Sequence, residues 1–213
     1  MRKLFSISFI NKTIKILLLF LFAINTGAAL YMPFFAIFVT KYIVGATLVT
    51  IGVSSALYSI TKSLVQIPTA KRLDAHPGEK DDFFIIICGA ICGIIYSFAF
   101  LFINHIWQLN LVQIFAGIGD ACTMAAYYAI FSHHIDKESQ GFEWSLFSVG
   151  GMTISAAIGG LIGGLIAEKF GFHSLFIFAG ILNIIGTIML ISLYPYIKIL
   201  RRPEHHKTLS HKK

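Results

Sequence analysis

Charged residues are scarce in this chain. Only 13% of its 213 residues are Asp, Glu, Lys or Arg, whereas 56% are hydrophobic, and the mean hydropathy is +0.78. A soluble domain carries about 25% charged residues, which keep its surface hydrated. The composition therefore excludes an ordinary soluble fold. The apolar residues gather in six long stretches, which leave little chain for a separate soluble domain.

Known catalytic motifs are also missing. The sequence has no His-Glu-x-x-His, no Gly-x-Ser-x-Gly and no phosphate-binding glycine loop. Ser132, His133, His134 and Asp136 crowd one predicted loop, but adjacent histidines cannot both point at one metal from a regular helix. We therefore predict a protein that is not an enzyme, with no catalytic residue, metal site or cofactor.

Cysteine is rare, and the positions of the three cysteines give little support for a redox site. All three cysteines lie inside apolar stretches, and Cys88 and Cys92 stand one helical turn apart. A redox pair is one interpretation of that spacing. Packing of small, polarisable side chains beside Gly89 and Gly93 is the favoured one.

Each apolar stretch is long enough to cross a bilayer, which needs about 20 apolar residues per helix. We predict spans at 16–40, 46–69, 83–103, 107–131, 145–167 and 173–197. The first stretch resembles a signal peptide, but its apolar run continues to Val39, so we expect it to be retained. The chain is then an all-α membrane protein with an N-terminal segment 1–15, a six-helix bundle 16–197 and a basic tail 198–213.

The basic residues predict how this bundle is oriented. With the N-terminus in the cytoplasm, fourteen Lys and Arg residues lie inside and only Lys41 and Lys169 lie outside. The positive-inside rule therefore places both termini on the cytoplasmic side of a multi-pass protein of the cell membrane. Anionic lipid headgroups can account for the net charge of +7, which needs no nucleic acid as a partner.

The breaks between the spans alternate in length. Short outer turns follow the first, third and fifth spans, and longer charged loops at 70–82 and 132–144 lie inside. This spacing divides the chain into two three-helix units of similar length, joined by one outer turn. Such units must face the membrane in opposite senses, which is the inverted repeat of many secondary transporters.

The loop after the second span carries a family resemblance. Residues 70–80 read AKRLDAHPGEK, and they resemble the Gly-x-Leu-Ala-Asp-Arg-x-Gly-Arg-Lys motif of the major facilitator superfamily. Asp74 is in register, Gly78 comes one residue late and Ala75 replaces an arginine. The whole chain resembles the N-terminal six-helix half of such a transporter. The family aspartate latches one conformation against the other half, so the resemblance implies Asp74, Gly78 and Lys80 as latch residues.

Two further motifs match the family with substitutions. Residues 113–119 resemble the fourth-span pattern Arg-x-x-x-Gly-x-Gly, with Gln113 in place of the arginine, which weakens any proton-coupling role borrowed from that arginine. In the fifth span the chain follows the spacing of the Gly-x-x-x-Gly-Pro-x-x-Gly-Gly antiporter motif, but Ser155 replaces a glycine and Ala156 the proline. Drug–proton antiport is therefore not favoured.

Small residues in the fifth span predict close helix packing without any resemblance. Gly151, Ser155, Gly159 and Gly163 recur every four positions, with Gly160 beside them. They form a smooth stripe that a neighbouring backbone can approach. Packing is the favoured interpretation, and helices that slide against each other are compatible with it. Pro33 and Pro68 each break regular helix hydrogen bonding and can mark a kink, and Pro68 lies where the second span is expected to end.

Only two charged side chains lie deep in the predicted spans, Lys62 and Asp120. At about 1.5 Å per residue, Asp120 is about 17 Å and Lys62 about 12 Å from the cytoplasmic ends of their spans, a difference that the lysine stem can cover. One interpretation is a buried pair that responds to a proton, cation or charged solute. In the other, Lys62 snorkels to the headgroups and Asp120 bonds to Thr123 or a neighbouring backbone.

The family lines its central cavity with the first and fourth spans, so the resemblance implies a solute pathway near Asn25, Gln113 and Asp120. Lys62 joins these pathway candidates through its pairing with Asp120. Tyr58 and Gln66 are weaker candidates, and Asn183 is expected to form an interhelical hydrogen bond. We therefore expect a transporter half that moves a small solute by alternating access with a second half, either a second copy or a separate chain. The alternative is a truncated or non-transporting scaffold or receptor-like protein. Substrate, coupling ion and direction stay open.

Overall fold

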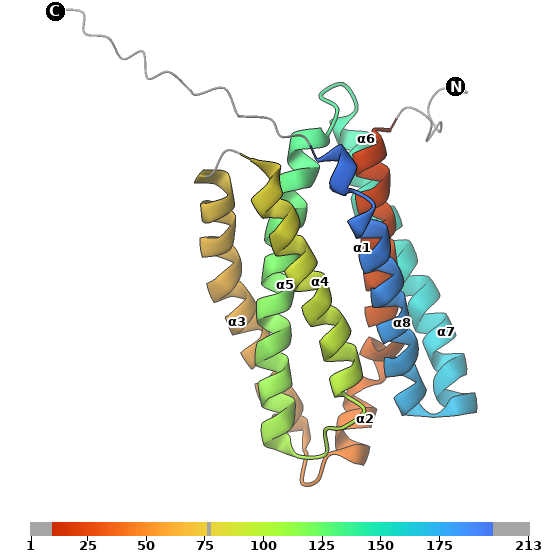
Figure 1. Cartoon of the computed structure of the whole chain (residues 1–213). Coiled ribbons are helices and arrows are strands. Elements are labelled where there is room, and N and C mark those ends of the chain that lie inside the picture. The colour runs from red at the N-terminus through yellow and green to blue at the C-terminus, as the bar shows by residue number, and fades with distance from the viewer. Residues whose placement is uncertain (1–9, 76–77, 198–213) are drawn as a thin grey trace, which may run out of the picture.

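The computed structural model describes residues 10–75 and 78–197. The predicted tail 198–213 and most of the predicted N-terminal segment 1–15 lie outside the described residues. Within these residues, six helical spans are long and apolar enough to cross a membrane, which confirms the predicted membrane bundle (Figure 1). They are Lys12–Tyr42, Leu48–Ala75, Glu79–Ala99, Ile106–His134, Gln140–Phe170 and Phe172–Tyr196.

Two of the spans are interrupted. The first consists of α1 (Lys12–Tyr31), a 3-10 turn η2 (Met32–Phe34) and α2 (Phe35–Tyr42). The fifth consists of α6 (Gln140–Ser145), a π-helix η3 (Leu146–Ile154) and α7 (Ser155–Phe170). The other spans are α3 (Leu48–Ala75), α4 (Glu79–Ala99), α5 (Ile106–His134) and α8 (Phe172–Ile191), followed by a 3-10 turn η4 (Tyr194–Tyr196).

Local sequence explains several helix ends. The side chain of Asn11 accepts a hydrogen bond from the Thr13 backbone N–H at 3.2 Å and so caps α1. At the start of α5, the side chain of Gln108 accepts from the backbone N–H of His105 at 3.1 Å. Gly171, with φ +81, ends α7 in a conformation that other residues rarely adopt.

The two prolines behave differently. Pro33 has no N–H, so the carbonyl of Ala29 loses its helical partner and the chain tightens into η2, as the sequence predicts. Pro68 lies inside α3, which continues to Ala75. The expectation that the second span ends near Pro68 was wrong, because a proline removes one hydrogen bond but the alanine, lysine and arginine that follow are good helix formers.

Both inner loops are shorter than predicted. Helix α3 reaches Ala75 and α4 begins at Glu79, so only 76–78 separate them instead of 70–82. Likewise, 135–139 separate α5 from α6 instead of 132–144. The apolar stretches underestimate the helices because hydropathy marks only the segment that lies in hydrocarbon, whereas charged residues continue a helix beyond it.

The helices pack in an exchanged pattern. Helix α5 packs against α3 and α4, while α1 packs against α7, η3 and α8, and α4 joins the two sets through α8. The first helix of each three-helix unit therefore packs against the second and third spans of the other unit. Two inverted copies of one motif produce this arrangement. It places α1 and α5 in the most buried spans, whereas the second and fifth spans are the least buried.

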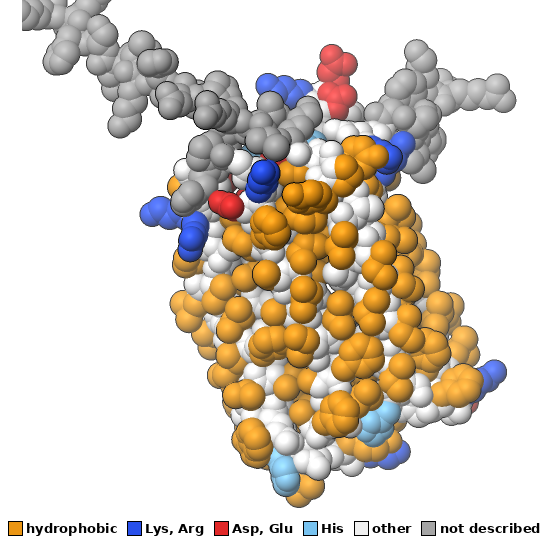
Figure 2. Space-filling model, in the orientation of Figure 1, with side chains coloured by type: hydrophobic (Ala, Val, Ile, Leu, Met, Phe, Trp, Pro, Cys, Tyr) orange, Lys and Arg blue, Asp and Glu red, His pale blue; other side chains and the backbone are white. Residues whose placement is uncertain are grey.

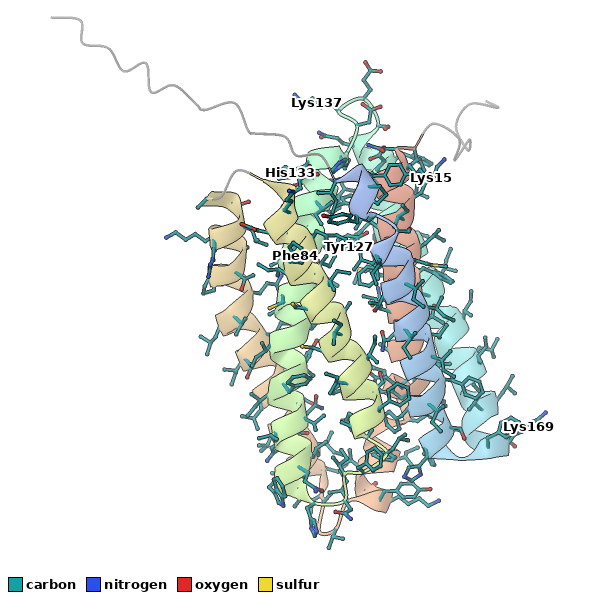
Figure 3. The ribbon with its side chains drawn as sticks, in the orientation of Figure 1. Lys15, Phe84, Tyr127, His133, Lys137 and Lys169 are labelled. Atoms are coloured by element: carbon teal, nitrogen blue, oxygen red, sulfur yellow. The ribbon has the colours of Figure 1, made fainter. Side chains whose placement is uncertain are left out.

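The surface has the layering of a membrane protein. Hydrophobic side chains cover the middle of the bundle and charged side chains gather at its two ends (Figure 2). We call the end that holds residues 10 and 197 the proximal end, and the opposite end distal. Figure 3 shows Lys15 and Lys137 at the proximal end and Lys169 at the distal end.

An aromatic cluster ties the two helix sets together at each end. At the distal end, the ring centroid of Phe176 lies 4.6 Å from that of Phe100 and 4.8 Å from that of Phe38. At the proximal end, Tyr127 on α5 packs on Phe147 of η3 with centroids 5.6 Å apart. Such contacts add to the stabilisation from apolar burial, so we expect the six helices to move as one body.

Candidate functional site

A cavity of about 600 Å³ lies between two clusters of buried apolar side chains, one toward each end of the bundle. Its walls come from the first four spans, from η3 and from α8. The volume falls within the range of pockets that bind small molecules. All four side chains predicted to lie near a solute pathway line this cavity: Asn25, Lys62, Gln113 and Asp120.

The two deep charges meet inside the cavity. The ammonium of Lys62 lies 2.5 Å from Oδ2 of Asp120. The hydroxyl of Tyr58 donates to the same oxygen at 2.6 Å. The lysine is thus engaged by the aspartate rather than by headgroups, and the Thr123 hydroxyl donates to the carbonyl of Gly119 instead of to Asp120.

Close packing of α3 on α5 makes this pairing possible. A Cβ atom at Gly117 would lie 2.7 Å from the carbonyl oxygen of Tyr58, so only glycine permits this approach without a backbone shift. The side chains of Lys62 and Asp120 remain 31% and 30% exposed. Since both line the cavity, the ion pair faces the cavity rather than a closed core. Charges at such depth are costly and commonly mark solute or ion pathways.

Asn25 has a structural partner as well as a place in the cavity wall. Its side-chain amide donates to the carbonyl of Gly151 in η3 at 2.9 Å. The hydroxyl of Ser155 donates to the same carbonyl at 2.7 Å. Short π-helical segments often occur at functional sites. The sequence offers only one weak sign of η3, the adjacent glycines Gly150 and Gly151.

Two other amides differ in their bonding. Gln113 is only 5% exposed and lines the cavity, yet it forms no hydrogen bond within the described part of the chain. Asn183 donates to the hydroxyl of Ser97 at 2.9 Å and to the carbonyl of Gly93 at 3.4 Å, which confirms the predicted interhelical bond. Gln113 is therefore available to a solute, whereas Asn183 holds α8 to α4.

The sequence missed several aromatic residues of the cavity. Tyr31 and Tyr96 line it with ring centroids 6.2 Å apart, and Phe35 lies beside them in the wall. Tyr58 was only a weaker candidate, although it binds Asp120 directly. An aromatic residue within an apolar stretch carries no mark that separates a cavity wall from a packed core. The polar candidates stood out because polar residues are rare there.

The small residues of the fifth span face α1. A Cβ atom at Gly159 would lie 2.6 Å from both the carbonyl oxygen of Thr26 and the Cβ of Ala29. At Gly160 the nearest atom would be Cγ of Pro33, 3.9 Å away. The residues buried in this contact are Gly151, Ser155, Gly159 and Gly163. Gly160 thus lies beside the contact rather than within it.

The predicted latch residues gather at the proximal end. Asp74 lies in the last turn of α3, Gly78 directly precedes α4, and Lys80 is exposed in the first turn of α4. Asp74 lines a second hollow of about 250 Å³ together with the exposed Tyr128 and Trp144. The aspartate is exposed, and the hollow gives it access to the surface.

The crowded residues Ser132, His133 and His134 form the end of α5, and Asp136 lies just beyond it. Ser132 donates to the carbonyl of Ala129 at 3.0 Å. Nδ1 of His134 lies 3.0 Å from the carbonyl of Ile130 and 3.7 Å from a carboxylate oxygen of Glu79. Within residues 10–75 and 78–197, no three His, Cys, Asp or Glu side chains are placed to hold a metal ion.

Comparison with known proteins relates this chain to a transporter family. The family profile described as Major Facilitator Superfamily matches residues 17–213. An uncharacterised MFS-type transporter of Methanocaldococcus jannaschii is 25% identical over 180 residues, which cover 84% of this chain and 45% of that protein. The chain thus spans about half the length of the curated relative that it matches.

Proposed function

Since the chain belongs to the major facilitator superfamily, we propose that it is one six-helix half of a transporter that moves a small solute across a membrane by alternating access. Its solute pathway runs along the central cavity past Asn25, Lys62, Gln113 and Asp120. Asp74, Gly78 and Lys80 form a latch that meets the other half in one conformation.

The observation that carries this proposal is the ion pair open to the cavity. An unsatisfied charge in the hydrocarbon costs on the order of 2.5–3.5 kcal/mol on insertion scales. Lys62 and Asp120 are each about a third exposed, so a lipid tail against them would leave charged surface unsolvated. Water, a solute and a second protein surface have to cover this wall of the bundle.

The second half is either another copy of this chain or a separately made chain. We propose that it docks along the second and fifth spans, which are the least buried of the six. The aromatic clusters at both ends hold this half together. Access to the cavity then changes when the whole six-helix body rocks against its partner.

The basic residues support an orientation with the proximal end in the cytoplasm of a cell-membrane protein. Lys15 and Lys137 lie at that end, whereas Lys169 lies at the distal end (Figure 3). The positive-inside rule assigns the lysine-rich end to the cytoplasm. In this orientation both termini are cytoplasmic, and anionic headgroups lie against the proximal lysines.

A combined mass and uptake measurement tests the proposal. The chain is reconstituted in nanodiscs and its complex is sized, first alone and then with any six-span protein encoded beside it. We expect the mass of two six-helix halves, and solute uptake by proteoliposomes that contain this complex but not by empty ones. A single copy that accumulates no solute in either setting would instead support a non-transporting scaffold.

A further inference from the structure

The ion pair keeps hydrogen-bonding capacity that faces the cavity. Tyr58 and Lys62 both bind Oδ2 of Asp120, and an ionised carboxylate has about four acceptor sites, so Oδ1 keeps accepting capacity. The Lys62 ammonium has three N–H donors, and Asp120 is its one salt-bridge partner within the described residues. Because both side chains line the cavity, the free oxygen and the free donors are accessible from the same space.

The charge of the cavity wall sums to zero. Lys62 and Asp120 are the only Lys, Arg, Asp or Glu residues among the described residues that line it. A solute with a single positive charge could bind Asp120, and one with a single negative charge could bind Lys62, but either would add one uncompensated charge to a neutral pair. An uncompensated charge in a partly buried site is costly. The wall therefore selects against singly charged solutes.

Gln113 is a third polar group in the cavity wall that a ligand could bind. It is only 5% exposed, and it forms no hydrogen bond within the described residues. It lies seven residues before Asp120 on α5, which places both on one face of the helix, about 10 Å apart along the axis. Buried amides normally find a partner, so a solute that reaches from the ion pair to Gln113 would complete the site.

We propose that the cavity binds a small zwitterion, a solute with one carboxylate and one ammonium group. Its ammonium donates to Oδ1 of Asp120 and its carboxylate accepts from the free N–H groups of Lys62, so four charges alternate in sign. Hydrogen bonds between charged groups are about twice as strong as neutral ones. A zwitterion therefore gains more from this wall than a neutral solute does. The inference rests on the proposed function only in taking the cavity as the solute site.

The first test uses ligands matched in shape. The full chain in nanodiscs is titrated with the standard L-amino acids, and binding is followed by thermal unfolding and equilibrium dialysis. For leucine, isoamylamine lacks the carboxylate, isocaproate lacks the ammonium and isocaproamide is neutral. We expect at least one amino acid to bind at least about tenfold more tightly than its three analogues. Equal binding of the neutral analogue, or no binding of any amino acid, would overturn the proposal.

The second test changes the charge of the wall. Lys62→Met leaves Asp120 alone and should reverse the preference toward the amine, whereas Asp120→Asn should reverse it toward the acid. The exchanged variant Lys62→Asp with Asp120→Lys keeps a neutral pair and serves as the folding control, since it should still prefer the zwitterion. An unchanged order of affinities in the two single variants would contradict recognition by this pair.

These experiments can reject the zwitterion proposal and the transporter proposal independently of each other. Uptake of a neutral solute by proteoliposomes, unaffected when Lys62→Met and Asp120→Asn are combined, would retain the transporter and reject the zwitterion. Binding of amino acids with the expected charge dependence, but without uptake in any reconstituted complex, would retain the zwitterion site and reject transport.

Discussion

Two neighbouring glycines of α7 allow a direct test of how the fifth span packs on α1. Gly159→Ala and Gly160→Ala make the same chemical change one residue apart in one helix. Each should gain the same helix propensity, up to about 1 kcal/mol. They differ in surroundings, because the new Cβ would lie 2.6 Å from Thr26 and Ala29 atoms at position 159 but 3.9 Å from Pro33 at position 160.

The geometry sets the expected size of the difference. A separation of 2.6 Å between heavy atoms is far inside van der Waals contact, and one of the opposing atoms is a backbone carbonyl oxygen. The helices must then move apart, and overpacking of this kind costs about 1–3 kcal/mol. Since the propensity gain cancels between the variants, we expect Gly159→Ala to be less stable than Gly160→Ala by about 1–3 kcal/mol. Gly159→Leu should lower the folded yield further.

Reversible unfolding in lipid–detergent micelles measures this difference. Trp107 and Trp144 provide the fluorescence signal, because they lie on separate spans. Gly160→Ala should unfold at the same denaturant concentration as the wild type or at a higher one. Equal midpoints for Gly159→Ala and Gly160→Ala would mean that the stripe does not press on α1, and the packing argument for this span would be lost.

Three further outcomes follow from the same contacts. In a double-mutant cycle, Lys62→Met and Asp120→Asn should each destabilise the bundle, and their combination should recover at least about 0.5 kcal/mol relative to additivity; additive losses would show that the two residues do not interact. Tyr127→Phe should leave the free energy of unfolding unchanged or raise it by about 1 kcal/mol, because the buried Tyr127 hydroxyl has no hydrogen-bond partner among the described residues; a clear loss of stability would reveal a bond. For topology, an impermeant maleimide added to intact cells should label Lys169→Cys and spare Lys80→Cys in a chain without its native cysteines, and the reverse pattern would invert the bundle.

The sequence predicted the number and order of the spans because the bilayer imposes a length on every apolar helix. It also predicted that Lys62 and Asp120 could meet, since charges are conspicuous in apolar stretches and the helical rise gives their depth. The distance between them needed the structure, because it depends on how closely α3 approaches α5. That approach depends on Gly117, whose place in the contact no local pattern reveals.

Other features depend on contacts between distant segments and were therefore not predictable. The π-helix η3 is held by Asn25, 126 residues away in the chain. Tyr31 and Tyr96 meet across two spans to line the cavity. Pro68 could not be placed either, because whether a proline ends a helix depends on what stabilises the turns beyond it.

The inverted repeat also explains why the two central helices carry different polar residues. Asn25 lies about 20 Å from the start of α1, and Asp120 lies about 20 Å from the start of α5, so they occupy equivalent depths in opposite directions. Asn25 binds the fifth span at Gly151, and Asp120 binds the second span at Lys62.

Each central helix thus holds the second span of the other unit through one polar side chain at mid-depth. The Asn25 contact is a hydrogen bond between a neutral amide and a carbonyl, so it does not need a charged partner. The Asp120 contact is an ion pair with an accepting oxygen and several N–H donors to spare. Both positions line the cavity, but only the Asp120 contact brings charged groups to its wall, and that difference supports the proposal that a solute binds at the α3–α5 side of the cavity.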